Sequence, residues 1–172
     1  MAPPEALARL EPEPGHVVLM CGLAGSGKTT FSKRLADTGF LRLSMDEAVW
    51  TGSGRYGLDF APTDYPKHLE AARGVIRARL IEAMDARTPA VVDSAFWNRA
   101  ARDDYKALVE AHGCRWSLVY LQAAPDLLRQ RLAARSQRFD ANAQFAVSET
   151  MLDRFLASFE APAGEGEMLV QA

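Results

Sequence analysis

Three groups of residues in this sequence have the side chains and spacing needed for phosphate chemistry, and the first is a glycine-rich stretch. Residues 22–29 read GLAGSGKT, which fits the pattern G-x-x-x-x-G-K-[ST]. The glycines let the backbone approach an anion, so that successive N–H groups can converge on phosphate oxygens. Lys28 adds a positive charge for the β- and γ-phosphates, and the Thr29 hydroxyl can bind Mg²⁺. The alternative interpretation is a glycine-rich turn with a solvated lysine.

Two carboxylates form the second group. Asp46 follows the short apolar run 40–44, and Asp93 ends the run 88–93. Both runs are typical of buried parallel strands, whose carboxyl ends form the ligand-binding edge of an open sheet. We therefore expect Asp46 to lie at the ligand-binding edge and Asp93 to hold Mg²⁺. The alternatives are a helix N-cap for Asp46 and a capping or more remote role for Asp93.

Arginines form the third group. The predicted helix that begins at Pro125 has an arginine-rich side, which leads into the segment 136–147, where there is no periodicity. The arginines are Arg129, Arg131, Arg135 and Arg138. This pattern describes either a lid over a triphosphate or a solvated helix face. The segment 47–65 mixes aromatic residues with glycines, which indicates either a mobile flap over the substrate or a loop docked on the core.

The elements around the glycine-rich stretch support a nucleotide site. The apolar run 16–21 predicts a buried strand, and 30–37 predicts a helix that ends before Gly39. A helix N-terminus facing the loop adds partial positive charge to an anion site. We expect the donor nucleotide to contact Gly22, Ala24, Gly25, Ser26, Gly27, Lys28, Thr29 and Thr30.

Composition limits the remaining possibilities. The 172 residues suit one domain, which we expect over 16–172 after a loose, proline-rich tail at 1–15. The net charge of −2 gives no overall field that would recruit nucleic acid, and the two cysteines provide no disulfide framework. No run of eighteen apolar residues and no signal peptide stands out, so we expect no membrane association and a cytoplasmic location.

Strands alternate with helices along the whole chain. Further helices are predicted at 66–87, 99–112, 125–135 and 150–159, and further strands at 115–121 and 168–170. An α/β fold with a doubly wound parallel sheet of about five strands, helices on both faces and right-handed crossovers follows from this alternation.

From residue 17 to 170, the sequence resembles P-loop kinases of the superfamily that includes adenylate and gluconate kinases, chloramphenicol phosphotransferase, zeta-type toxins and polynucleotide 5′-kinase domains. The resemblance rests on 22–29, on Ser44-Met45-Asp46, on Val91-Val92-Asp93 with Arg99 and Arg102 after it, and on Arg131 and Arg135. It implies strand order 2-3-1-4-5 and a helical lid. It also implies that Asp46 is the general base and that two lid arginines, Arg131 and Arg135, bind the donor phosphates.

These observations predict an ATP-dependent phosphotransferase that moves the γ-phosphoryl group to a hydroxyl of a small molecule. Lys28, Asp46, Arg131 and Arg135 are the expected catalytic residues, and Thr29 and Asp93 the expected Mg²⁺ ligands. A polynucleotide 5′-kinase and an ATP-binding regulatory module remain as alternatives. The GTPase signature N-K-x-D is absent from the sequence, which argues against a switch GTPase.

Overall fold

A five-stranded parallel sheet forms the centre of the protein, which we describe from a computed structural model covering residues 1–171. Its strands are β1 (His16–Cys21), β2 (Leu41–Ser44), β3 (Ala90–Asp93), β4 (Arg115–Gln122) and β5 (Glu167–Gln171). All pairings are parallel and the order is β2-β3-β1-β4-β5, which confirms the predicted fold class and strand order. Every residue of β1 is buried, as expected for a central strand covered on both faces.

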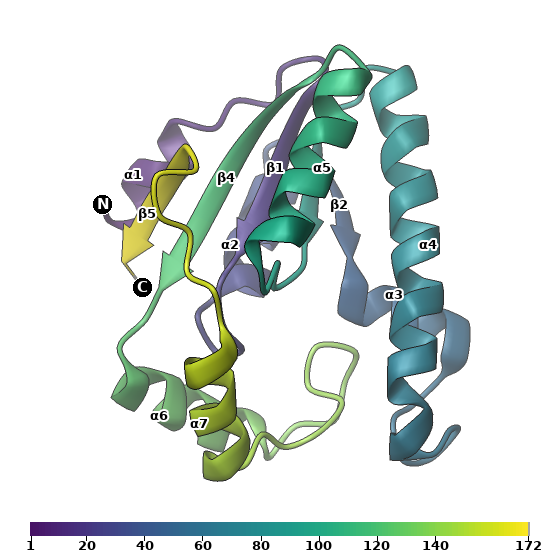
Figure 1. The fold of residues 1–172 in the computed structure, drawn as a ribbon, viewed down its shortest axis with the longest axis vertical. Helices are drawn as coiled ribbons and strands as arrows, with labels where there is room; N and C mark the ends of the chain where they lie inside the picture. The colour runs from purple at the N-terminus through teal and green to yellow at the C-terminus, as the bar shows by residue number, and fades with distance from the viewer. Residues whose placement is uncertain (172) are drawn as a thin grey trace.

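Helices cover both faces of the sheet (Figure 1). On one face, Val18 and Met20 of β1 pack in a core with residues of α1 (Pro3–Ala8) and α2 (Lys28–Asp37). On the other face, Val17 and Leu19 pack in a core with α3 (Met45–Ser53), α4 (Tyr65–Asp85) and α5 (Arg99–Ala111). Alternate residues of one strand therefore supply two separate cores.

The two remaining helices, α6 (Pro125–Arg135) and α7 (Glu149–Ser158), lie beyond the carboxyl ends of the strands. They share a third apolar cluster with Leu23 of the glycine-rich loop, through Leu128, Leu132 and Leu152. The segment between the two helices reaches across toward α3, where Phe139 contacts Trp50 with ring centroids 5.6 Å apart. These elements form the helical lid that the resemblance implied.

The first fifteen residues differ from the predicted loose tail. Residues 3–8 form α1, and Ala6 and Leu10 are buried against the sheet. The amino group of Met1 donates to the carbonyl of Leu169 at 3.1 Å, and Gln171 N–H donates to the carbonyl of Met1 at 3.0 Å. Pro3 and Pro4 start this helix rather than prevent it, because Pro is tolerated in the first turn.

The segment 47–65 is also more regular than the flap or loop that we expected. Its first part belongs to α3, which continues to Ser53, and a single 3-10 turn η1 (Pro62–Asp64) leads into α4. Ser44 is the N-cap of α3, and its side chain accepts a hydrogen bond from the N–H of Glu47. Among residues 1–171, no helix has both the length and the apolar character needed to cross a membrane.

Candidate active site

The glycine-rich loop joins the end of β1 to the start of α2 at the carboxyl edge of the sheet. Gly25 and Gly27 have φ values of 83° and 102°, in the left-handed region that favours glycine. A Cβ on Gly22 would lie 2.5 Å from the carbonyl oxygen of Leu121, so the loop closes only with glycine there. Gly27 caps α2 without a side-chain hydrogen bond, which leaves the first N–H groups of the helix facing outward for an anion.

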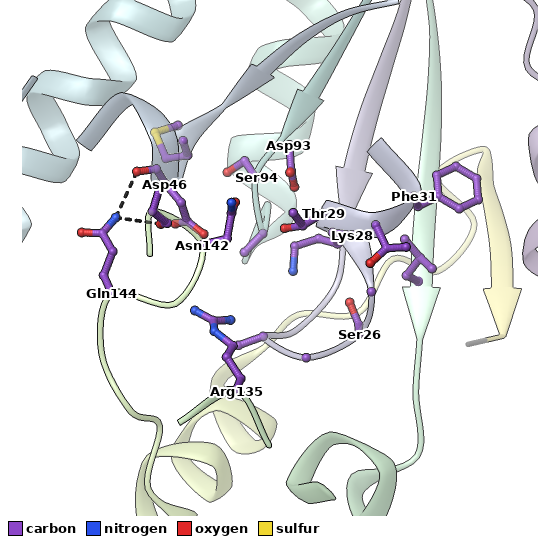
Figure 2. A pocket seen from close by; sticks show the side chains of 18 of the residues that line it. Ser26, Lys28, Thr29, Phe31, Asp46, Asp93, Ser94, Arg135, Asn142 and Gln144 are labelled. Carbon is purple, nitrogen blue, oxygen red and sulfur yellow. Dashed lines mark hydrogen bonds between the residues drawn. The ribbon is translucent and has the colours of Figure 1, made fainter. Parts of the chain in front are cut away.

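A cavity of about 980 Å³ opens at this loop. Its lining includes Ala24 to Thr30 of the loop and α2, together with all the other residues that we predicted for the site except Gly22: Asp46, Asp93, Arg131 and Arg135. Gly22 is buried in the turn that supports the loop. The predicted donor site and the predicted base therefore share one cavity, as Figure 2 shows.

Lys28 and Ser26 contribute the first polar atoms of the donor side. The Lys28 ammonium donates to the carbonyl of Leu23 at 2.9 Å, and burial lowers its pKa despite the attraction of Asp93 and Asp46. The buried Ser26 hydroxyl has no hydrogen-bond partner among the described residues. An anion bound in the loop would satisfy the hydroxyl and favour the charged lysine.

Asp46 lies in the first turn of α3, two residues after β2 ends. Ser44 is paired in register with Asp93, which puts both predicted carboxylates at the same edge. Ser44, not Asp46, is the N-cap residue, so the capping alternative for Asp46 is wrong. Within the described chain, the Asp46 carboxylate accepts no hydrogen bond, and burial together with the nearby Asp93 raises its pKa.

The Asp93 carboxylate is held by a network that sequence reasoning missed. Arg42 donates to its Oδ2 at 2.6 Å, and the Ser32 hydroxyl donates to the same oxygen at 2.8 Å. Arg42 also donates to Glu47 at 2.6 Å, and Glu47 accepts from the Asn142 side chain at 3.4 Å. This Arg42 network joins the strand edge to the segment between α6 and α7. The only signal in the sequence was that Arg42 is a charged residue within the apolar run 40–44, which does not reveal its partners.

The lid arginines divide into three positions. Arg131 lies over the loop and donates to the carbonyls of Gly25 and Ser26 at 3.2 and 3.4 Å. Arg135 points into the cavity, and its Nε is buried without a partner in the part of the chain described (Figure 2). Arg129 pairs instead with Asp126 and Asp153 on the outside of the lid.

Arg99 and Arg102 do not line this cavity, although both contributed to the resemblance. Arg102 is fully buried and forms an ion pair with Glu165 at 2.6 Å. It also donates to the carbonyls of Phe96 and Glu160 at 3.0 and 2.8 Å, which attaches the chain before β5 to α5. Arg99 is exposed and lies near Asp103. Their observed contacts are structural.

Other lining residues were not among those that we predicted for the site. Asn142, Gln144 and Phe145 belong to the segment between the lid helices, and Tyr65 and Leu69 come from the start of α4. The available signal in the sequence was that two polar residues, Asn142 and Gln144, alternate with apolar residues in 141–145.

The fold and the site define a P-loop nucleotide-binding protein of the kinase-like type. The chain belongs to the AAA domain family, which matches residues 17–162. It is 28% identical over 125 residues to a UPF0200 protein of Pyrobaculum aerophilum, a match that covers 73% of this chain and 69% of the relative.

Solved structures show the same fold. A presumed kinase from Chloroflexus aurantiacus superposes with a TM-score of 0.72 at 18% identity, covering 93% of this chain and 85% of that one. A gluconokinase from Sinorhizobium meliloti gives 0.57 at 22% identity, covering 94% and 83%. A chain of the Pnkp1/Rnl/Hen1 RNA repair complex gives 0.60 at 18% identity, covering 88% of this chain and 48% of its own length. The predicted resemblance to P-loop kinases is confirmed at the level of the family and fold.

Proposed function

We propose that the protein is an ATP-dependent phosphotransferase that moves the γ-phosphoryl group to a hydroxyl of a small molecule. The observation that supports this most directly is the position of Asp46, in the cavity that also contains Lys28 and the loop. A carboxylate with no hydrogen-bond partner among the described residues and a raised pKa suits a general base. Simple phosphate binding would need no such group.

Each residue then has one task in an in-line transfer. The loop N–H groups and Lys28 bind the β- and γ-phosphates of ATP. Arg135 stabilises charge on the oxygens of the transferring group, and Arg131 holds the loop and the outer side of the phosphates. Asp46 accepts the proton of the attacking hydroxyl. Positioning and charge stabilisation of this kind supply most of the catalysis in phosphoryl transfer.

The residues at the cavity also fit a magnesium ion that arrives with the nucleotide. The Thr29 hydroxyl and the Asp93 carboxylate are oxygen donors of the kind that Mg²⁺ prefers, and both line the cavity. Only Oδ2 of Asp93 is occupied by Arg42 and Ser32. Among residues 1–171, no group of three or more acidic, histidine or cysteine side chains could hold a metal. We therefore assign Thr29 and Asp93 as ligands of an ion bound mainly by phosphates; bound there, it would neutralise charge on the β- and γ-oxygens.

The test is transfer of label from γ-³²P-ATP to a panel of alcohols, sugars, nucleosides and 5′-hydroxyl oligonucleotides. We expect ATP consumption to rise strongly only when an acceptor is present, and the labelled product to be the acceptor phosphate. Slow ATP hydrolysis that no acceptor stimulates would instead indicate a regulatory module. Preferential labelling of the oligonucleotides would indicate a polynucleotide kinase.

A further inference from the structure

Two side-chain oxygens on the acceptor side of the cavity have no hydrogen-bond partner in the described chain. They are Gln144 Oε1 and Asn142 Oδ1, both buried, and the Gln144 residue is only 4% exposed. Both residues line the cavity next to Asp46, across from Arg135 and the loop (Figure 2). Buried polar atoms are usually paired, so two exceptions on residues that line one cavity point to a ligand.

The orientation of the Gln144 amide is set by its other end. Its Nε2 donates to the carbonyl of Asp46 at 3.0 Å and to the carbonyl of Ala141 at 3.1 Å. Because both donors are used by the backbone, the amide oxygen must be the free atom. The Asn142 side chain likewise donates to Glu47 and retains a free oxygen. The contact from Gln144 to the Asp46 backbone also ties this pair of amides to the segment that carries the proposed base.

Hydrogen-bond acceptors therefore dominate this part of the cavity. Gln144 Oε1, Asn142 Oδ1 and the Asp46 carboxylate are all acceptors, which pair with O–H or N–H groups. An anionic group placed here would leave the amide oxygens unpaired and would be repelled by Asp46. Lys28 and Arg135 lie on the donor side, where the nucleotide phosphates occupy them. Arg73 and Arg138 also line the cavity, and each is paired with a carboxylate, Glu70 and Asp140.

An apolar wall completes the acceptor side. Tyr65, Leu69 and Phe145 line the cavity, and the rings of Tyr65 and Phe145 meet edge to face with centroids 5.5 Å apart. Such a wall binds the C–H face of a ring or a planar group by excluding water. The site thus combines acceptors on one side with an apolar surface on another.

We propose that Gln144 and Asn142 form the acceptor subsite, and that they select an uncharged, polyhydroxylated cyclic molecule with one apolar face. This inference rests on the proposed phosphotransferase function and specifies its substrate class. One hydroxyl of the acceptor lies on Asp46, which takes its proton as the oxygen attacks the γ-phosphorus and ADP leaves. A second hydroxyl donates to Gln144 Oε1 and fixes which oxygen reacts.

The experiment measures binding and transfer separately. Saturation-transfer NMR, with a non-hydrolysable ATP analogue and Mg²⁺ present, tests binding of D-glucose, myo-inositol and adenosine against gluconate and a 5′-hydroxyl oligonucleotide. Labelled ATP then tests phosphorylation of the same compounds. We expect at least one of the three uncharged compounds to bind and to be phosphorylated in preference to the anionic ones.

Variants separate recognition from a structural role of the glutamine. Gln144→Leu should raise the KM for the acceptor about tenfold or more, the effect of one lost buried hydrogen bond, with the Kd for ATP unchanged. Gln144→Glu keeps an acceptor oxygen but loses the donor to the Asp46 backbone, so it should retain more acceptor affinity than Gln144→Leu. Gln137→Leu is the matched control, because Gln137 is exposed in the same segment and does not line the cavity.

The outcomes distinguish this inference from the proposed function. Binding of an uncharged compound that weakens in Gln144→Leu, without phosphate transfer, would support the subsite and contradict the kinase activity. Preferred phosphorylation of gluconate or the oligonucleotide would overturn the inference and retain the kinase activity. The inference is also wrong if none of the three uncharged compounds binds, or if both Gln144 variants lower the melting temperature equally and leave the acceptor KM unchanged.

Discussion

Replacing Asp46 with asparagine separates the proposed catalytic role of this carboxylate from any role in stability. The substitution keeps the size of the side chain and removes its ability to accept a proton. The side chain makes no hydrogen bond within residues 1–171, and the helix that contains it, α3, is capped by Ser44. We therefore expect α3 to remain intact and the Kd for ATP to stay within a few-fold of the parent.

The expected loss is in transfer alone. A positioned general base contributes about 10²- to 10⁴-fold in rate, so Asp46→Asn should lower kcat for the acceptor by that amount. In the parent, burial raises the pKa of Asp46, and the rate should fall on the acid side at a pH above the ordinary carboxyl value of 3.8. This acid limb should disappear in the variant.

Asp46→Asn should make the folded protein more stable, although it lowers the transfer rate. A pKa raised in the folded state means that ionised Asp46 is less favourable there than in the unfolded chain. This cost is present at pH values above the raised pKa and vanishes below 3.8. Asp46→Asn should therefore melt at a higher temperature than the parent at pH 7 to 8, and the difference should shrink as the pH falls toward about 4.

One preparation serves for calorimetry, nucleotide titration and the transfer assay. Asp37→Asn is the matched control, because Asp37 is exposed at the end of α2 and does not line the cavity. Near-parent transfer by a folded, ATP-binding Asp46→Asn protein would refute the general-base role. A lower melting temperature at pH 7 would refute the account of its environment.

Three further predictions concern the donor side and the buried ion pair. Lys28→Ala should weaken ATP binding and abolish turnover, because no other charged side chain of the loop reaches the β- and γ-phosphates. Isothermal titration and the label assay measure the two effects, and parent-like values would refute the loop assignment. Arg135→Ala and Arg131→Ala should lower kcat more than they raise the KM for ATP, with the larger effect at Arg135, whereas Arg129→Ala, outside the cavity, should change neither. Glu165→Ala should cost about 3–5 kcal/mol in urea unfolding because it leaves Arg102 buried and unpaired. The hydrogen bond from Arg102 lowers the pKa of Glu165 to about 2 from its usual 4.5. The parent should therefore lose the stability that this ion pair contributes as the pH falls from about 4.5 to 2. An acid unfolding profile that is the same in the variant and the parent would contradict this account.

The parts of the fold that the sequence predicted depend on local patterns. The apolar run of β1, the glycine-rich loop and the helix after it occur together within about twenty residues, and each has a distinct composition. The position of Asp46 beside Asp93 followed from the rule that carboxyl ends of parallel strands share an edge. Helix α3 was missed because Gly52, Ser53 and Gly54 hide the end of a short helix.

The unpredicted parts of the site depend on contacts between distant segments. Gln144 meets the backbone of Asp46 across 98 positions, and Arg42 meets Asp93 across 51. Neither pairing produces a periodic pattern in the sequence, because at least one partner of each pair lies outside an amphipathic helix, the element whose packing gives such a pattern. Helix α1 was hidden for a related reason: it buries mainly Ala6, whose small side chain adds little to an apolar pattern.

The Arg42 network has a consequence for how a phosphotransferase of the proposed kind can diversify. Arg42 divides its guanidinium between Asp93, on the side of the proposed metal ligands, and Glu47, which accepts a hydrogen bond from Asn142 of the proposed acceptor subsite. An exchange at Asn142 that suits a new acceptor also alters the grip of Glu47 on Arg42, and so the charge that Asp93 retains for the metal. Substitutions on the two sides should therefore be epistatic, and descendants that adopt a different acceptor should also change their divalent-ion requirement.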